Sequence, residues 1–329
     1  SVVRRQRQMC IRDSFISFFA ILTYIYKTTD SIALASSTVL LETVGKLMSY
    51  FSFPSLLNYT SAKKVIVFSQ FSSGLLVGVL FLFASEIIVV SPYVVLGVYF
   101  LLVLCSQFFD AARELHSKTA THQSHHLKAQ SLIMSQFFSA QFIGPIVSFI
   151  LISYLNQALP LLLDAGTFLV AGVMSLKLNE IKLKQGVHRL SSLRPLKYIL
   201  KKKELLTIFL IRGIGTKFYI AVFNVLVFSV VTDHLDIKLI NSAWIYSLIG
   251  LGSFIPANFL SKKNIPNWLG GEKYGEVWVA FLALGLLLVS RVGFVNIPTI
   301  SIAALLVFIG GIANGSVAVT TRSIRRKVC

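Results

Sequence analysis

The chain has 329 residues, of which 55% are hydrophobic and only 13% are charged. That leaves too little polar side-chain surface to cover a soluble globular protein of this size, so the sequence predicts an all-α polytopic membrane protein. A net charge of +18 would suit a nucleic-acid partner, but the basic residues are distributed over alternate loops, which argues against a nucleic-acid-binding surface. The three cysteines are widely separated and predict neither a disulfide framework nor a metal site.

Residues 1–14 form a polar, basic leader without the layout of a signal peptide. The stretch RQMCIRDS within it resembles translated sequencing-adapter sequence, and we expect the leader to be non-native. The first apolar run follows at 15–26. As a helix, this run would rise about 18 Å, less than the roughly 30 Å of a bilayer core. We therefore expect the first span to be incomplete.

Further apolar runs follow, separated by polar loops. We expect spans two to six at 31–57, 65–84, 93–110, 129–154 and 161–176, and spans seven to ten at 205–231, 239–260, 274–290 and 298–320. A basic segment at 177–204, with nine Lys and Arg residues, separates the two groups. The expected organisation is an N-terminal bundle at 15–176, a soluble central loop and a C-terminal bundle at 205–329. In the third span, Gly74 and Gly78 form a GxxxG pair that permits close helix approach.

The basic residues mark one side of the membrane. Of the 31 Lys and Arg residues, 21 fall in alternate connections: the loops 58–64 and 111–128, the central segment, the loop after span eight and the C-terminal tail. The intervening loops hold only Lys27, Lys238 and Arg291. Loops rich in Lys and Arg face the cytoplasm. We therefore expect a multi-pass protein of the inner (plasma) membrane, with the central loop in the cytoplasm.

Ionisable side chains inside the spans are the first candidates for function, because they are costly in a membrane unless paired or hydrated. Glu42 lies about 16 Å into the second span, with Lys46 one turn further on. Glu before Lys at i,i+4 is the favourable pairing order, so one interpretation is a self-neutralised pair. The other is that Glu42 takes up and releases a proton. Asp164, near the outer end of span six, is either a helix-end polar residue or a second proton carrier. Asp110 and Arg113 share a helix face at the inner end of span four, as expected of a gating or structural ion pair.

Four segments resemble a known family: FFDAAREL (108–115), QFIGPIVSF (141–149), LLLDAGTFLVAGV (161–173) and SLIGLGSFIPA (247–257). They resemble the drug-efflux and siderophore-efflux branch of the major facilitator superfamily, the group of the macrolide exporters and the enterobactin exporter. The resemblance covers about residues 15–329. It implies the major facilitator fold with two six-helix bundles, of which about ten spans are present here and the last two are missing.

The same resemblance implies a secondary active transporter that exports an amphipathic small molecule in exchange for protons by alternating access. Spans one, four, seven and ten surround the cavity in that family, which makes candidate lining residues of Gln107, Lys217, Asn224 and Asn314. Each of them is also compatible with interhelical packing. An importer or a lysophospholipid flippase of the same fold remains open. The expected partners are a lipophilic small molecule, protons and the lipid bilayer, with no cofactor.

Two motifs depart from the family pattern. The loop after span two normally carries an Asp-Arg pair and then basic residues; here Asn58 stands in the Asp position, whereas Lys63 and Lys64 keep the basic end. In the family that acidic residue helps to latch the inward-closed state, so the gating function expected of this loop is altered. The antiporter motif of span five keeps Gly144 and Pro145 but loses its other glycines.

Functions of other classes have weaker support. The HxxHH pattern at 122–126 resembles one histidine box of membrane desaturases and hydroxylases, and imidazoles suit iron. Those enzymes need about eight histidines in three boxes, and this chain has six. Incidental divalent-metal binding and a solvated loop are the other interpretations of His116, His122, His125 and His126. No GxxxxGK[ST] motif is present, which argues against an ATP-driven pump on this chain. An inactive fragment is the remaining alternative.

Overall fold

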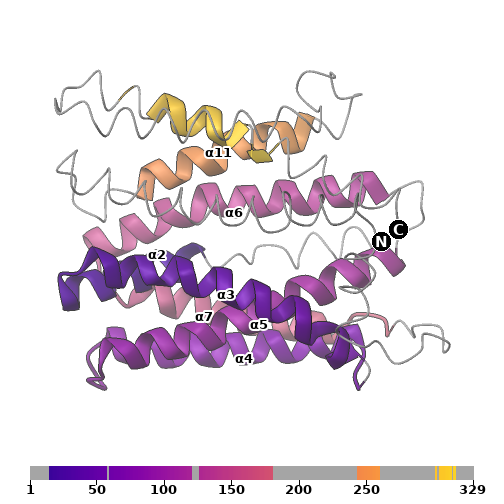
Figure 1. Ribbon diagram of the computed structural model, residues 1–329, viewed down its shortest axis with the longest axis horizontal. Coiled ribbons are helices and arrows are strands. Elements are labelled where there is room, and N and C mark those ends of the chain that lie inside the picture. Colours follow the sequence, from indigo (N-terminus) through magenta and orange to yellow (C-terminus); the bar gives the residue numbers. More distant parts are fainter. Residues whose placement is uncertain are drawn as a thin grey trace, which may run out of the picture. The chain divides into compact units, whose positions relative to one another are not determined.

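The computed structural model describes residues 15–57, 59–120, 126–180, 243–259, 301, 304–312, 314 and 315 (Figure 1). The leader, most of the central segment and the predicted spans seven and nine lie outside the described residues. Every regular element in the described part is a helix, which confirms the all-α class.

Each described helix overlaps one of the expected spans. The helices are α2 (Phe15–Thr29), α3 (Ile32–Leu57), α4 (Ala62–Ala84), α5 (Pro92–Ala120), α6 (His126–Tyr154), α7 (Leu159–Leu176) and α11 (Ala243–Phe259). Helical residues 304–312 fall in the tenth expected span. Four of the described helices, α4 to α7, are long and apolar enough to cross a membrane. The first helix is longer than the apolar run predicted for it, at 15 residues.

Two expected loops are partly helical. The predicted loop over 111–128 is wrong for most of its length, because α5 continues to Ala120 and α6 begins at His126. The polar residues that indicated a loop there include Arg113, His116 and Ser117, and all three are buried against other parts of the chain. Likewise α4 begins inside the predicted loop 58–64. Ser61, with extended backbone, accepts a hydrogen bond from the backbone N–H of Lys64 at 3.4 Å and so caps the helix.

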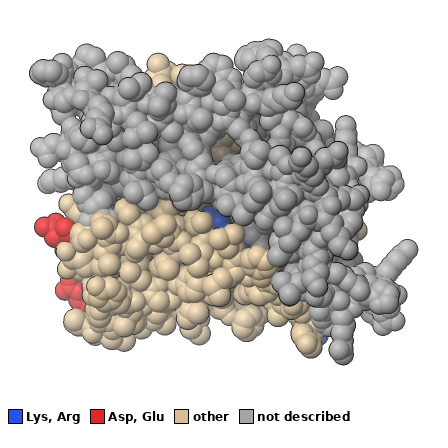
Figure 2. All heavy atoms as spheres, in the orientation of Figure 1, with Lys and Arg blue, Asp and Glu red and all other residues tan. Residues whose placement is uncertain are grey.

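The inner face of α4 includes polar side chains, and its outer face carries large apolar ones. Ser69, Gln70 and Ser73 are buried, whereas Phe68 and Leu75 are 72% and 67% exposed. In water, that arrangement would place apolar surface outward and polar groups inward, against the usual preference. In a bilayer, the outer face meets lipid, and polar groups turn toward other helices. On the face in Figure 2, the described residues are largely uncharged, with acidic side chains near one end. These features belong to a membrane-embedded protein.

Contacts divide the described chain into two compact units, each built from segments that are distant in sequence. One unit holds α3, α4, α5, α2 from Tyr24 onward and α7 from Leu161 onward. In this unit α4 packs against α7 at two glycines. A Cβ on Gly74 would lie 3.1 Å from a methyl group of Leu169, and one on Gly172 would lie 3.2 Å from the Phe71 ring. A Cβ on Gly78 would meet nothing within 4 Å, so only Gly74 of the predicted GxxxG pair makes a close contact.

The other unit holds α6, α11, α2 up to Thr23 and the helical residues 304–312, 314 and 315. Aromatic contacts join its helices: the rings of Phe15 and Phe137 are 5.7 Å apart, and those of Phe19 and Tyr246 are 5.0 Å apart. Figure 1 shows α6 and α11 lying along one another. Their common core is formed by Ile133, Met134, Phe138 and Ala257, with Phe137 and Phe254 packed against it.

Candidate functional site

Glu42 lies in the middle of α3. It follows the first residue of this 26-residue helix by ten positions, a rise of about 15 Å. The segment forms a helix around it because neighbouring positions are mostly Leu, Val and small residues, with no glycine before Gly45. Glu42 is therefore well inside the helix, and its depth in a membrane stays a prediction.

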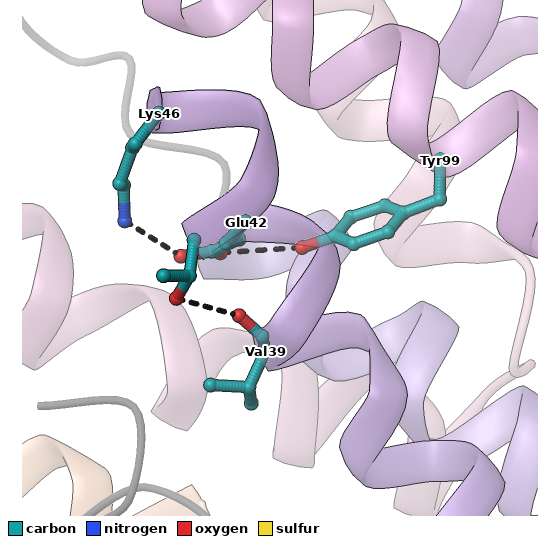
Figure 3. Close-up of polar contacts among 5 residues, drawn as sticks. Val39, Glu42, Lys46 and Tyr99 are labelled. Carbon is teal, nitrogen blue, oxygen red and sulfur yellow. Dashed lines mark hydrogen bonds and ion pairs between the residues drawn. The ribbon is translucent and has the colours of Figure 1, made fainter. Parts of the chain in front are cut away.

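Lys46 pairs with Glu42 across one helical turn. Its Nζ lies 3.0 Å from Glu42 Oε2, and the two side chains are 31% and 33% exposed (Figure 3). The i,i+4 pair predicted from the spacing is confirmed. Because a third of each side chain is exposed, the carboxylate is not sealed inside the helix bundle. Its participation in proton coupling stays a prediction.

Tyr99 provides a second partner from another helix. The Tyr99 hydroxyl donates a hydrogen bond of 3.2 Å to Glu42 Oε1, so the two carboxylate oxygens have different donors (Figure 3). The Tyr99 side chain comes from α5 and the residue is only 3% exposed. Sequence reasoning missed this residue. The signal was a tyrosine inside an apolar span, since a buried tyrosine hydroxyl usually finds a polar partner.

A glycine brings α3 close enough to α5 for this contact. A Cβ on Gly45 would lie 2.6 Å from Val103 Cγ1 and 3.8 Å from the Phe100 ring. Gly45 follows Glu42 by three residues, and Val103 follows Tyr99 by four, so both contacts lie on one pair of helix faces. Because Gly45 has no side chain, α3 and α5 can lie close together at this point. Their separation determines the distance between the Tyr99 hydroxyl and the Glu42 carboxylate.

The arrangement can carry a proton-dependent change of charge. With Glu42 ionised, its negative charge balances the ammonium of Lys46, and Tyr99 is neutral. A proton on Glu42 would cancel the carboxylate charge and with it the ion pair to Lys46. An ammonium group inside a membrane is costly unless it is paired or hydrated.

The predicted ion pair at the inner end of span four is present. Arg113 Nη2 lies 2.9 Å from Asp110 Oδ1, and the guanidinium carbon of Arg113 is 5.3 Å from the ring centroid of Phe109. The arginine side chain is 9% exposed and the aspartate 39%. Stacking on the ring and pairing with the carboxylate compensate the buried guanidinium. The geometry is that of a structural pair, and a gating role stays a prediction.

Two contacts attach the residues after α7 to the ends of α4 and α5. The Ser61 hydroxyl at the start of α4 donates to Glu180 Oε1 at 3.1 Å. A ring nitrogen of His116 lies 3.3 Å from the backbone oxygen of Asn179. An acidic group beside a helix N-terminus is favourable. The beginning of the basic central segment is thus held against the helix ends.

The basic residues of the altered motif are part of a helix. Lys63 and Lys64 lie in the first turn of α4, Lys64 being exposed, rather than in a loop. Positive side chains are unfavourable at this end of a helix, and the Glu180 carboxylate at Ser61 offsets them. Asn58 lies outside the described residues.

Asp164 is buried in the second turn of α7, at 4% exposure. The Thr167 hydroxyl donates to the backbone oxygen of Asp164 at 2.8 Å and lies 3.3 Å from its Oδ1. The position near the start of α7 agrees with the expectation of a polar residue close to the helix end, and its side chain is enclosed. Its proton-carrying role stays a prediction.

Of the four candidate cavity residues, the structure describes Gln107 and Asn314, which belong to different units. Gln107, in α5, is partly exposed. Asn314 donates from Nδ2 to the Ser253 hydroxyl at 3.3 Å, and Ser253 donates to the backbone oxygen of Gly311 at 2.8 Å. That contact joins α11 to the tenth expected span and fits the packing interpretation of Asn314. Lys217 and Asn224 lie outside the described residues.

The Gly-Pro pair of span five lies within α6 and adjoins α2. A Cβ on Gly144 would lie 2.8 Å from Phe15 Cβ, so the glycine allows close contact between the helices. One turn on, the Ser148 hydroxyl donates to the backbone oxygen of Ile16 at 2.9 Å. Pro145 cannot donate to the carbonyl of Gln141, which leaves that carbonyl without its α-helical donor.

The histidines are not gathered in the part that can be described. His116 is buried and contacts Asn179, as noted above, whereas His122 and His125 lie outside the described residues. Within residues 15–57, 59–120 and 126–180 and the described remainder, no group of three His, Cys, Asp or Glu side chains could hold a metal ion.

Comparison with known proteins identifies the fold. The family model of the Major Facilitator Superfamily matches residues 9–327. The solved structure of a mutant of the nucleoside transporter NupG superposes with a TM-score of 0.64 at 15% identity, covering 99% of this chain and 82% of that one. That of a D-xylose-proton symporter gives a TM-score of 0.66 at 12% identity, covering 96% and 81%. A comparison with curated protein sequences gives no match.

Proposed function

Because the chain belongs to the major facilitator superfamily, we propose that it is a secondary active transporter that exports an amphipathic small molecule in exchange for protons. The chain is a multi-pass membrane transporter rather than an enzyme, and it has the all-helical fold of that superfamily. Efflux, antiport and the amphipathic substrate are the proposed part. They are supported by the resemblance of its FFDAAREL and QFIGPIVSF segments to the efflux branch.

The observation that carries the proposal is the ion pair of Glu42 and Lys46 within α3, with Tyr99 on the second carboxylate oxygen. An isolated charge here would be costly, and the pair is neutral only while Glu42 is ionised. Proton arrival from one side and release to the other would therefore accompany opposite states of the transporter. In this scheme, Glu42 carries the coupling proton and Asp164 is the second candidate carrier.

The remaining residues have proposed places in the same cycle. Asp110 and Arg113 act at the inner end of the predicted span four, within α5, as a gate or as a structural pair. Substrate-contact roles are proposed for Gln107, Lys217, Asn224 and Asn314. Gly144 and Pro145 permit the close approach of helices during the change of state, and Asn58, Lys63 and Lys64 belong to the altered latch. The bundles 15–176 and 205–329 would move about the cytoplasmic segment 177–204, in the inner membrane.

The test is transport by the purified chain in liposomes with an imposed pH gradient. A fluorescent lipophilic cation and a macrolide serve as probes, with Glu42→Gln compared to wild type. We expect gradient-dependent movement that is mostly lost in Glu42→Gln, because glutamine cannot exchange a proton. Glu86→Gln, in the exposed turn after α4, is the matched control and should resemble wild type. Substrate movement that ignores the gradient would rule out antiport, and equal activity of the two variants would leave Glu42 as a structural partner of Lys46.

A proton-coupled importer is the second candidate. The solved relatives with this fold include a nucleoside transporter and a D-xylose-proton symporter. Protonation of Glu42 does not by itself determine in which direction the solute moves. A proton gradient can drive export in exchange for protons or import together with protons. Accumulation of radiolabelled nucleoside or D-xylose under an inward proton gradient would favour symport over export. Movement of lysophospholipid instead would favour the flippase alternative.

A further inference from the structure

Helix α11 contacts a different helix on each of two opposite faces, and each contact is made through a glycine. Gly250 lies against α6, where a Cβ on it would be 2.6 Å from the carbonyl carbon of Gln141. Gly252 lies against the tenth expected span, where a Cβ on it would meet the backbone oxygen of Phe308. Because successive residues of a helix are about 100° apart, positions 250 and 252 point in nearly opposite directions. All three helical segments belong to one unit.

The face of α11 toward the tenth expected span is held at the backbone. A Cβ on Gly311 would lie 3.0 Å from Gly252 Cα, and one on Gly315 would lie 2.7 Å from Ser253 Cα. Beside these contacts, the buried Ser253 hydroxyl donates to the backbone oxygen of Gly311 at 2.8 Å and accepts from Asn314 Nδ2 at 3.3 Å. Backbones this close leave no room for a layer of side chains that could repack as the helices slide. This face therefore resists relative motion of the two helices.

The face of α11 toward α6 changes in character along the helix. At Gly250 the two backbones touch without interlocking side chains, so the helices can tilt there and remain in contact. Eight positions further on, a rise of about 12 Å, the Ser135 hydroxyl donates to Asn258 Oδ1 at 2.9 Å. Asn258 Nδ2 donates to the backbone oxygen of Phe254 at 3.1 Å, which orients the amide. A hydrogen bond between neutral side chains costs little to break, and the adjacent core includes the adaptable side chain of Met134.

We propose that α11 and the tenth expected span move as one piece, and that α6 tilts against this piece about the Gly250 contact and parts from it near Asn258. This inference rests on the proposed function, because it supplies a motion that alternating access requires. Helix α6 belongs to the predicted N-terminal bundle at 15–176, whereas α11 and the tenth expected span belong to the predicted C-terminal bundle at 205–329. The bond between Ser135 and Asn258 is then a closing contact near the predicted inner ends of α6 and α11, made in one state and broken in the other.

Thiol accessibility tests which face of α11 opens. Single cysteines are introduced at two buried positions, Met134→Cys toward α11 on α6 and Ser253→Cys toward the tenth expected span on α11. The full chain is used, with its three native cysteines replaced by serine. In the purified protein, we expect Met134→Cys to react with N-ethylmaleimide at least about tenfold faster than Ser253→Cys, because its interface opens locally.

Removal of the closing hydrogen bond is the matched perturbation. Ser135→Ala takes away the hydroxyl that donates to Asn258 and leaves the rest of the interface in place. Added to Met134→Cys, it should speed the reaction about fivefold, the scale of one neutral hydrogen bond. Added to Ser253→Cys, it should leave the rate unchanged. Equal rates at the two cysteines, or an effect of Ser135→Ala that is the same at both, would overturn the inference.

A reversible bridge tests whether this opening belongs to transport. Ser135→Cys and Asn258→Cys are joined by a short thiosulfonate linker in the purified chain, and movement of the fluorescent lipophilic cation into liposomes is measured before and after reduction. We expect the bridged chain to lose transport and the reduced chain to regain it. Local opening in the labelling experiment, together with transport that ignores the proton gradient, would support the motion of α6 and overturn proton coupling. Proton-driven transport that survives the bridge would do the opposite.

Discussion

Polar side chains inside the helices differ in whether they have found a partner. Tyr99 bonds to Glu42, and Arg113 to Asp110. Gln70, in contrast, is fully buried in α4, and neither atom of its amide has a hydrogen-bond partner among the described residues. A buried amide without partners loses its hydration and gains nothing in return. It is a cost that an apolar side chain of similar shape would remove.

Gln70→Met should therefore stabilise the protein. Methionine has a similar length and flexibility and no amide to desolvate, so we expect the free energy of unfolding to rise by about 1 kcal/mol. The measurement is thermal unfolding of the purified protein in detergent. Gln107→Met, at a partly exposed position on α5, is the control and should change little. A lower melting temperature for Gln70→Met would show that the amide bonds to a group within the helix unit.

At this scale, the sequence predicts contacts within a helix better than contacts between helices. The pairs Glu42–Lys46 and Asp110–Arg113 follow from i,i+4 and i,i+3 spacing, because helical geometry alone brings such residues together. Tyr99 could not be assigned to Glu42 in this way. Its partner depends on the rotation and separation of two helices, which the hydrophobic runs of a membrane protein do not specify.

Helix packing in each unit depends on a few glycines, and these differ in what surrounds them. Gly250, in α11, lies against the backbone of α6: a Cβ there would be 2.6 Å from the carbonyl carbon of Gln141 and 2.7 Å from Phe142 Cα. This is the peptide group whose carbonyl Pro145 leaves without its helical donor. Gly78, in α4, has open space around its Cα. The position of Gly250 therefore has no room for a side chain, whereas that of Gly78 does.

Substitution by alanine should separate the two glycines. Gly250→Ala forces a methyl group into the backbone of α6, which cannot move aside as a flexible side chain would, and we expect a loss of about 1–3 kcal/mol. Gly78→Ala meets no neighbour and improves helix propensity, for a gain of up to about 1 kcal/mol. The melting temperatures of the two variants should therefore change in opposite directions. A stable Gly250→Ala protein would show that α6 and α11 are not in close contact.

Helix existence was predictable from the sequence, but helix ends were not. An apolar run locates each described helix, because the backbone must satisfy its own hydrogen bonds in lipid. The polar stretch after Asp110 looks like a loop only if its polar groups are taken to be in water. Arg113, His116 and Ser117 are buried instead, and this tertiary burial extends α5 by ten residues beyond the expected end.

For the molecule as a whole, two independent properties agree on a membrane environment. The outer faces of the described helices carry large apolar side chains, such as Phe68 and Leu75 on α4, while serine and glutamine turn inward. The basic residues gather in alternate connections along the sequence. The first property concerns which face meets lipid, and the second concerns which side of the membrane each loop occupies. Together they make the orientation of individual helices testable.

The ends of α4 should lie on opposite sides of the membrane. With 23 residues, the helix is about 34 Å long, enough to cross a bilayer core of roughly 30 Å. Lys64, at its first turn, belongs to a basic connection, whereas Val89, 88% exposed in the turn after it, does not. With the three native cysteines replaced by serine, Val89→Cys should react with a membrane-impermeant maleimide on intact cells. Lys64→Cys should react only after permeabilisation.

Labelling in detergent supplies the control for accessibility, because both positions are exposed and both should then react fully. The reverse pattern in intact cells would place the loops rich in Lys and Arg outside and invert the proposed direction of proton flow through Glu42. Labelling of both positions in intact cells would mean that α4 does not cross the membrane, despite its length. The proposed pattern instead places Ser61 and Glu180 on the cytoplasmic side, where their hydrogen bond attaches the start of the central segment to the helix ends.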